Sequence, residues 1–309
     1  MNGSPVNGKT QGGEVVYIPP SFYPKPPPPP ELYAPETRFA ASAVAPAVDL
    51  ALATLLSPSQ VNTYLECPTR WYFKYLADLP DPAGSALAVG KAVDNSLSYY
   101  FRAKAEGIEV PPSDVLDAVD TAWADEEVIT QFFDNENADE LHQLCRRLVE
   151  SYLTQMAPKI QPALIDGVPA VQLPVSGEIA DVKVRGYIDI LTADGTVIDF
   201  KTKRDKPYGI TADHMLQVTT YSMLCPHSRG KAELHYMVKG RSTTAPTKNV
   251  PFTLDIGSAE VQYAESVYPA VQEAMRDGLY LPNRNARLCS RRLCPFWKAC
   301  EKEFGGHVK

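Results

Sequence analysis

The chain has 309 residues, of which 44% are hydrophobic and 22% charged, and this balance excludes a largely disordered protein. No run approaches the roughly 18 apolar residues of a membrane span, and no signal-peptide pattern opens the chain, so we expect a cytoplasmic protein without membrane contact. The formal charge is −7, but residues 113–140 hold ten Asp or Glu and no Lys or Arg. The remainder is net basic, so a polyanionic partner is not excluded.

The first 46 residues are rich in proline. They hold eleven of the 28 prolines, five of them in a row from Pro26 to Pro30. Proline fixes φ and removes a hydrogen-bond donor, so this stretch favours polyproline II. It could be a tether or a ligand for a proline-binding groove, but we favour a plain disordered arm. We expect the remaining residues, 47–309, to form a single domain.

A helical region is predicted over 57–160. Ser57-Pro58-Ser59-Gln60 has the residues of a helix start, and we expect the helix to run through Leu76. Helical spacing of apolar residues indicates another helix within the acidic stretch. Two further helices are expected, over 86–105 and 138–156.

The pattern changes to alternation and β-branched residues after Ile165. It predicts three strands, over 171–179, 182–191 and 196–201, and Asp194-Gly195 indicates a two-residue hairpin turn between the last two. The later elements expected are a helix over 212–224, strands over 233–238 and 250–254, and a helix over 258–277. We therefore expect an α/β fold, with a mixed sheet flanked by helices in a core over 165–277, a helical insertion, and a cysteine-rich tail over 280–309.

The most informative residues are two aspartates and a lysine on the predicted hairpin. Asp189 and Asp199 would come from neighbouring strands, and Lys201 would share a face with Asp199 because the two are two residues apart. Two carboxylates on adjacent strands suit Mg²⁺ or Mn²⁺, and a lysine beside them can act on a water or a phosphate. Alone, this pattern is also that of a charged, solvated hairpin.

Other segments accompany this pattern in a fixed order. Gln217 and Tyr221 lie four apart on the following helix and hence on one face. Upstream, the helix that begins near Gly90 offers a third carboxylate, Asp94. Further upstream, a serine-led helix ends in Tyr-x-x-Cys-Pro, with its cysteine at position 67.

In this order the segments resemble the RecB-type nucleases of the PD-(D/E)XK superfamily. The resemblance implies a restriction-endonuclease-like core and a metal-dependent DNA nuclease that hydrolyses phosphodiester bonds, with exonuclease action on single-stranded or frayed ends. It further implies that Asp94, Asp189, Asp199 and the carbonyl of Phe200 hold the metals, that Lys201 acts on the attacking water and the scissile phosphate, and that Gln217 and Tyr221 brace the site. Many members place a histidine where this chain has Asp94; an aspartate can also bind a hard cation.

Four of the six cysteines form a second constellation. Three lie in the tail, at Cys289, Cys294 and Cys300, and Cys67 lies far upstream. Clustered cysteines in a cytosolic protein indicate metal, and their spacing alone allows either Zn²⁺ or a 4Fe–4S cluster. The set is similar to the iron–sulfur staple of AddB-type and CRISPR-associated relatives, which implies a cluster that pins the tail to the first helix. The gap of four residues after Cys289 is wider than is common there.

A rival interpretation is a non-catalytic DNA-binding or redox-sensing module with an iron–sulfur or zinc centre and a degenerate nuclease site. The intact Lys201 argues against it. The sequence lacks the Gly-x₄-Gly-Lys-Ser/Thr loop of a helicase, so any unwinding must come from a helicase or another repair or recombination partner. The remaining cysteines, Cys145 and Cys225, are expected to be small buried hydrophobes.

Overall fold

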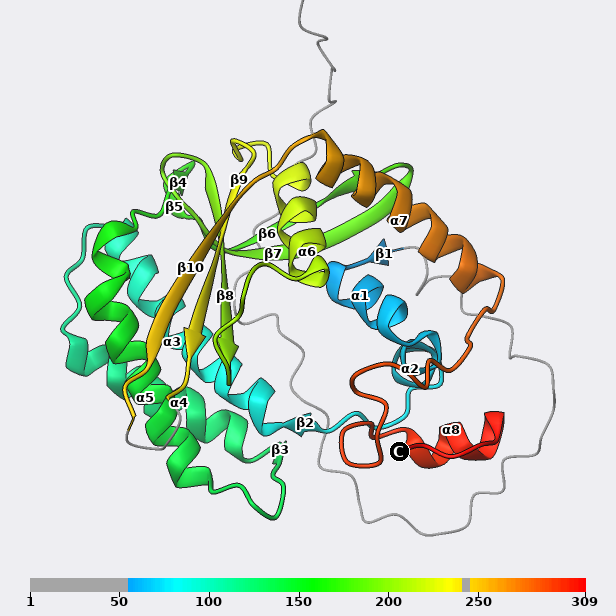
Figure 1. Cartoon of the computed structure of the whole chain (residues 1–309). Helices are drawn as coiled ribbons and strands as arrows, with labels where there is room; N and C mark the ends of the chain where they lie inside the picture. Colours follow the sequence, from blue (N-terminus) through cyan, green and yellow to red (C-terminus); the bar gives the residue numbers. More distant parts are fainter. Residues whose placement is uncertain (1–54, 241–244) are drawn as a thin grey trace, which may run out of the picture.

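The computed structural model describes residues 55–240 and 245–309, and the predicted proline-rich arm lies outside this part of the chain. Helices cover both faces of a central sheet (Figure 1). The helices are α1 (Pro58–Glu66), α2 (Pro68–Trp71), α3 (Ser85–Ala105), α4 (Pro112–Glu127), α5 (Ala138–Gln155), α6 (Ala212–Leu224), α7 (Ser258–Arg276) and α8 (Trp297–Phe304). A π-helical turn spans Tyr72–Leu76, and a 3₁₀ turn spans Ala157–Lys159.

The main sheet is mixed. Its strands are β1 (Leu55–Leu56), β6 (Val171–Ile179), β7 (Val182–Leu191), β8 (Thr196–Lys203), β9 (Lys231–Val238) and β10 (Lys248–Asp255). The order is β1-β7-β8-β9-β10, with β6 also paired to β7. The pairs β6–β7, β7–β8 and β9–β10 are antiparallel, whereas β8–β9 and β1–β7 are parallel. The predicted α/β fold with a mixed sheet is confirmed.

Two short pairs lie outside this sheet. β2 (Ala83–Gly84) runs parallel to β3 (Thr130–Gln131) and connects the start of α3 with the end of α4. β4 (Leu164–Ile165) and β5 (Val168–Pro169) form a small antiparallel pair before β6.

The first predicted helix is interrupted, which corrects the expectation of one helix through Leu76. Its start is as predicted, because the Ser57 hydroxyl accepts a hydrogen bond from the Gln60 N–H at 3.3 Å. It ends after nine residues, and Cys67 has extended dihedrals, φ −158° and ψ 104°. Cys67 precedes Pro68, and the proline ring disfavours the helical conformation in the residue before it. The helix therefore ends there, and the chain restarts as α2 at Pro68.

The β7–β8 turn also differs from the prediction of a two-residue loop. The Thr192 N–H donates to the Thr196 carbonyl at 3.0 Å, so three residues lie between the paired positions. The last of them, Gly195, has φ +81°. A three-residue hairpin loop commonly ends in a left-handed residue, which explains why Asp194-Gly195 is found at this turn without forming a two-residue loop.

Each face of the sheet is covered by its own helices. The helical insertion α3–α5 packs on one face, where Phe101, Trp123 and Tyr152 join Ile198 and Phe200 in one apolar cluster. The clusters on the other side draw on α1, α6 and α7. No helix within the described residues has the length and apolar character needed to cross a membrane.

Candidate active site and cysteine pocket

The two hairpin aspartates lie where β7 and β8 separate. The strands pair at Ile190–Ile198 and Leu191–Val197, and Asp189 and Asp199 occupy the next opposed positions, beyond the last pair. The Asp189 carboxylate accepts a hydrogen bond from the main-chain N–H of Phe200 at 2.7 Å. This bond takes the place of a main-chain hydrogen bond between the two strands. The divergence of the two strands therefore leaves room for both carboxylates between them.

Lys201 follows Asp199 on the same face of β8 and forms an ion pair with it. Asp199 is only 1% exposed. Burial favours the neutral lysine, but the charges of Asp199 and Asp189 outweigh it and raise the pKa of Lys201 above its usual value. The ammonium form is therefore favoured at this position.

A third carboxylate, Asp94, reaches the site from α3. Burial, followed by the charge of Asp199, raises the pKa of Asp94 to about 7. Burial and the neighbouring charge of Asp94 raise the pKa of Asp189 well above its usual range. One lysine therefore faces three acidic groups, of which Asp199 is buried and Asp94 and Asp189 are half-buried. This surplus of acid is the donor chemistry that a divalent cation would satisfy.

Gln172 is part of this arrangement, and the sequence analysis missed it. Its side-chain Nε2 lies 3.0 Å from both oxygens of Asp94 and 3.3 Å from Oδ1 of Asp189. Its backbone has φ +52°, in the left-handed region. A lone glutamine in an alternating strand carries no signal for such a conformation, so the sequence pattern could not have found it.

Gln217 and Tyr221 form a hydrogen-bonded pair on α6 beside the same strands. Gln217 Nε2 donates to the Tyr221 hydroxyl at 2.8 Å. Burial and the nearby Asp199 carboxylate raise the pKa of Tyr221, so its phenol stays protonated. A Cβ on Gly186 would lie 2.4 Å from the Tyr221 ring. The glycine of the Gly-x-Ile-Asp segment thus lets the ring lie against β7.

His214 is buried one turn before Gln217 on α6. Its Nδ1 lies 2.7 Å from the Tyr236 hydroxyl. Burial, and then the charge of Lys201, lower the pKa of His214 to about 4. The imidazole is therefore neutral at physiological pH and adds no positive charge to the site.

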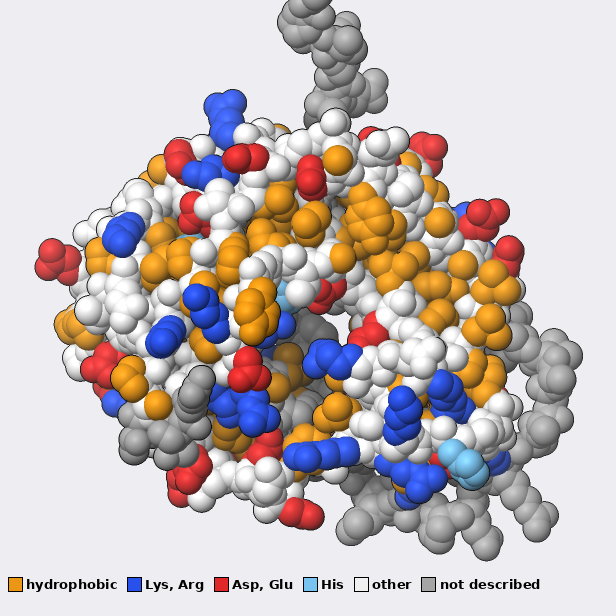
Figure 2. Space-filling model, in the orientation of Figure 1, with side chains coloured by type: hydrophobic (Ala, Val, Ile, Leu, Met, Phe, Trp, Pro, Cys, Tyr) orange, Lys and Arg blue, Asp and Glu red, His pale blue; other side chains and the backbone are white. Residues whose placement is uncertain are grey.

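Basic side chains approach the site from the tail. Figure 2 shows a hollow near the middle of one face, with Lys and Arg side chains around it. Burial lowers the pKa of Lys203 at the end of β8, and the like charges of Arg287 and Lys201 contribute to this. Arg287 of the tail therefore lies within electrostatic reach of the end of β8, and this basic surface suits a phosphate backbone.

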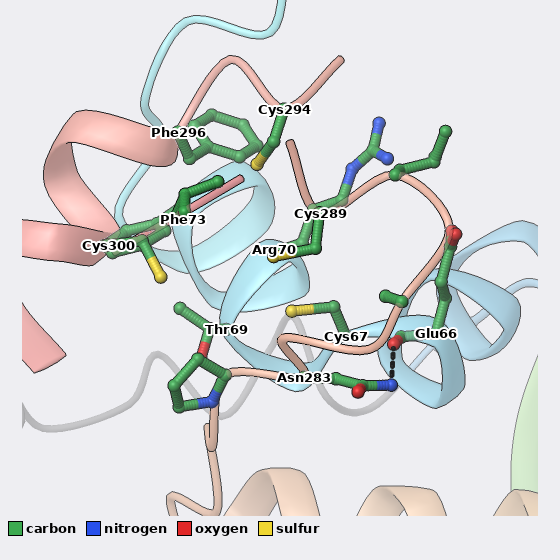
Figure 3. Close-up of a pocket in the computed structure, with 14 residues that line it drawn as sticks. Glu66, Cys67, Thr69, Arg70, Phe73, Asn283, Cys289, Cys294, Phe296 and Cys300 are labelled. Carbon is green, nitrogen blue, oxygen red and sulfur yellow. Dashed lines mark hydrogen bonds between the residues drawn. The ribbon is translucent and has the colours of Figure 1, made fainter. Parts of the chain in front are cut away.

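The four cysteines of the second constellation line one pocket. Cys67 lies between α1 and α2, and Cys289, Cys294 and Cys300 come from the tail and α8 (Figure 3). The tail is held there by Asn283, whose Nδ2 donates to the Glu66 carbonyl at 2.8 Å. The other two cysteines are buried separately in the core, as expected.

The pocket combines apolar walls with one arginine, Arg70, and the charge of a second, Arg284, reaches its thiols. Burial raises the pKa of Cys300 to about 11, while Arg284 acts in the opposite direction. Burial also raises the pKa of Cys294, and Arg70 opposes this. Phe73 and Phe296 pack together at 5.8 Å between ring centres beside the thiols.

Neither constellation is arranged as a closed metal site. Among residues 55–240 and 245–309, no group of three His, Cys, Asp or Glu side chains is positioned to hold one ion. At the acidic site, Gln172 engages Asp94 and Asp189, and Lys201 engages Asp199. The carboxylate oxygens of the acidic site are donors that suit a hard divalent cation, and the cysteine sulfurs of the pocket suit a thiolate-bound metal centre.

The family model of the PD-(D/E)XK nuclease superfamily matches residues 55–301. The chain belongs to this superfamily. It is therefore a nuclease with DNA as its substrate, of a class that uses divalent metals such as Mg²⁺ or Mn²⁺. The match spans both the acidic site and the cysteine pocket.

Two solved structures are similar to this chain at low identity. A candidate exonuclease of Eubacterium rectale is 12% identical, with a TM-score of 0.48 over 80% of this chain and 90% of its own. The protein SSO0001 is 15% identical, with a TM-score of 0.35 over 70% of this chain and 85% of its own. No curated protein matches the sequence.

Proposed function

We propose that this nuclease degrades single-stranded or frayed DNA from its ends, with Asp94, Asp189, Asp199 and the Phe200 carbonyl holding Mg²⁺ or Mn²⁺. The observation that carries the proposal is the surplus of acid where β7 and β8 separate. Three carboxylates converge there on one lysine, and burial, followed by the charges of the neighbouring carboxylates, raises the pKa values of Asp94 and Asp189. When bound, a divalent cation supplies positive charge to the phosphate oxygens in the transition state.

Lys201 has the position and charge to act on the scissile phosphate. Its ion pair with Asp199 fixes the direction of the side chain, and its raised pKa keeps the ammonium protonated. A protonated amine can orient an attacking water and offset the charge that develops on the phosphate. Loss of this group should therefore affect catalysis more than folding.

Gln217 and Tyr221 would brace the site and the DNA backbone. The hydrogen bond between them orients both side chains, and the Tyr221 ring rests against β7 at Gly186, three residues before Asp189. A rigid support of this kind keeps reacting groups within a fraction of an ångström of a productive geometry. We therefore assign them positioning roles.

We also propose that the cysteine pocket holds a 4Fe–4S cluster, with Zn²⁺ as the less favoured occupant. The four thiols share one pocket, and four thiolates suit either tetrahedral Zn²⁺ or a 4Fe–4S cluster. The similarity of this cysteine set to the iron–sulfur staple of AddB-type and CRISPR-associated relatives favours the cluster. Arg70 and Arg284 would favour the thiolate forms that either metal centre requires.

We propose that residues 47–309 act as one nuclease domain in the cytoplasm. A helicase, or another repair or recombination protein, would supply any unwinding.

The nuclease assignment is tested with end-labelled linear and circular single-stranded DNA and Mn²⁺. We expect the wild type to degrade the linear strand, Lys201→Ala to lose this activity, and the control Lys183→Ala, an exposed lysine on β7, to retain it. Cutting of the circle would contradict a purely exonucleolytic mode. If the wild type binds DNA and degrades neither strand, the binding-module interpretation replaces the proposal.

The cluster assignment is tested on protein purified without oxygen. We expect brown protein with iron and acid-labile sulfide in equal amounts, and loss of both in Cys67→Ser and Cys300→Ser. Colourless protein that contains zinc would overturn the iron–sulfur assignment and leave a zinc-bound tail.

A further inference from the structure

Gln172 combines an unfavourable backbone conformation with contacts to two acidic groups of the site. Its strand neighbours Val171 and Leu173 pair with Ile190 and Ile188, so Gln172 stands opposite Asp189. The register continues unchanged on both sides, yet Gln172 itself has φ +52°. An L-residue with a long side chain rarely adopts this region, and such strain persists where the surroundings enforce it.

In this conformation the side chain contacts both acidic groups. The Gln172 amide nitrogen lies 3.0 Å from both oxygens of Asp94 and 3.3 Å from Asp189. The two aspartates come from different elements, α3 and β7, and the amide connects them. Each carboxylate oxygen has two lone pairs, so an amide N–H can use one and leave the other for a cation.

We propose that Gln172 is a positioning residue of the metal site, which orients Asp94 and Asp189 toward a shared divalent cation. The amide offsets part of the repulsion between two neighbouring acidic groups and fixes their rotation before a cation arrives. This inference rests on the metal ligands assigned under the proposed function. It adds a residue that contacts the ligands without contacting the substrate.

The structure also defines the opposite possibility, in which the amide competes with the cation. The nitrogen stands between the carboxylates, and a cation that had to displace it would bind more tightly once it was removed. The two cases predict opposite changes in affinity for Mn²⁺. The sign of that change therefore decides between them.

The test is calorimetric titration of the full chain with Mn²⁺, for the wild type, Gln172→Leu and Gln172→Gly. Loss of a residue that orients metal ligands typically weakens metal binding 10- to 100-fold, and we expect both variants to show a loss of this size. Gln161→Leu, an exposed glutamine near the β7–β8 turn, is the matched control and should bind as the wild type does.

Thermal melting without metal separates positioning from folding. Both variants lack the amide, but glycine accepts φ +52° without strain and leucine does not, so Gln172→Gly should melt no lower than Gln172→Leu while both bind Mn²⁺ more weakly than the wild type. Equal or tighter binding by Gln172→Gly would overturn the inference and leave the proposed metal ligands in place. Absence of Mn²⁺ binding by the wild type would overturn both.

Discussion

Close packing of a ring against the backbone decides which residue can stand at position 186. A Cβ there would lie 2.4 Å from Cε1 and 3.0 Å from Cδ1 of Tyr221, far inside van der Waals contact. Gly186→Ala should therefore displace the Tyr221 ring, break its hydrogen bond with Gln217 and destabilise the fold by about 1–3 kcal/mol. Urea unfolding and DNA degradation measure the two effects. Gly209→Ala, where a Cβ meets nothing within 4 Å, is the control, and equal losses in both variants would contradict the prediction.

His214 should make the protein sensitive to acid. Its pKa is about 4 in the folded protein against a usual 6.5, so the unfolded chain binds the proton more readily. The stability that the neutral imidazole contributes is present above pH 6.5 and is lost as the pH falls toward 4. His214→Asn should flatten this part of the curve of unfolding free energy against pH. An unchanged slope in the variant would show that other groups cause the acid sensitivity.

The acidic pair and its lysine were within reach of sequence reasoning because they depend on strand alternation. Asp199 and Lys201 share a face through the two-residue period, and the hairpin brings Asp189 opposite them. Gln172 was not within reach, since its role depends on a left-handed φ that alternation does not encode. The close approach at Gly186 likewise requires the position of a ring from another element.

At the scale of elements, the sequence predicted helices better than the breaks between them. Strands β6 and β7 and helix α6 have the predicted bounds, because their hydrophobic period is clear. The first helix was predicted too long because its apolar side chains continue in phase into α2, where Trp71 joins the same cluster as Val61 and Tyr64. Pro68 marked the break, and the extended Cys67 before it joins the wall of the pocket.

The tail is attached to the first helices by an aromatic anchor. Tyr280 stacks on Trp71 and Tyr72, with ring centres at 5.8 and 5.0 Å, and is 7% exposed. Its hydroxyl donates to the Met275 carbonyl at 2.7 Å.

Tyr280→Ala should therefore cost about 3–5 kcal/mol in the free energy of unfolding, as for other large aromatic truncations. The neighbouring Leu281→Ala removes a side chain that is 72% exposed and should cost less than about 0.5 kcal/mol. Denaturant unfolding of both variants measures the difference. Similar losses would mean that the anchor lies elsewhere in the tail.

At the scale of the whole molecule, the tail connects two parts of the chain that are distant in sequence. Asn283 binds the end of α1 through the Glu66 carbonyl. On the other side, the Arg292 guanidinium donates to Asn135 at 3.2 Å and lies 4.9 Å from the Phe133 ring, both in the loop before α5. The tail thus spans from the first helix to the helical insertion, past the hollow visible in Figure 2.

Loss of the proposed cluster should release this tail while the core stays folded. The contacts that residues 284–309 keep with the rest of the chain include the packing of Phe296 on Phe73 beside the thiols and the exposed hydrogen bond from Arg292 to Asn135. An exposed hydrogen bond contributes little, and the Phe296 contact lies at the wall of the emptied pocket, so we expect the segment to open more often once the metal is lost. Trypsin should therefore cleave first at Arg284, Arg287, Arg291 or Arg292 once the metal is removed by oxidation and chelation, and more slowly in the metal-loaded protein. Cys67→Ser should be cleaved there without chelation, and Cys225→Ser, whose thiol lies outside the pocket, should resist as the wild type does. Equal resistance of the loaded and metal-free proteins would show that side-chain packing and hydrogen bonds hold the tail, with no structural role for a metal.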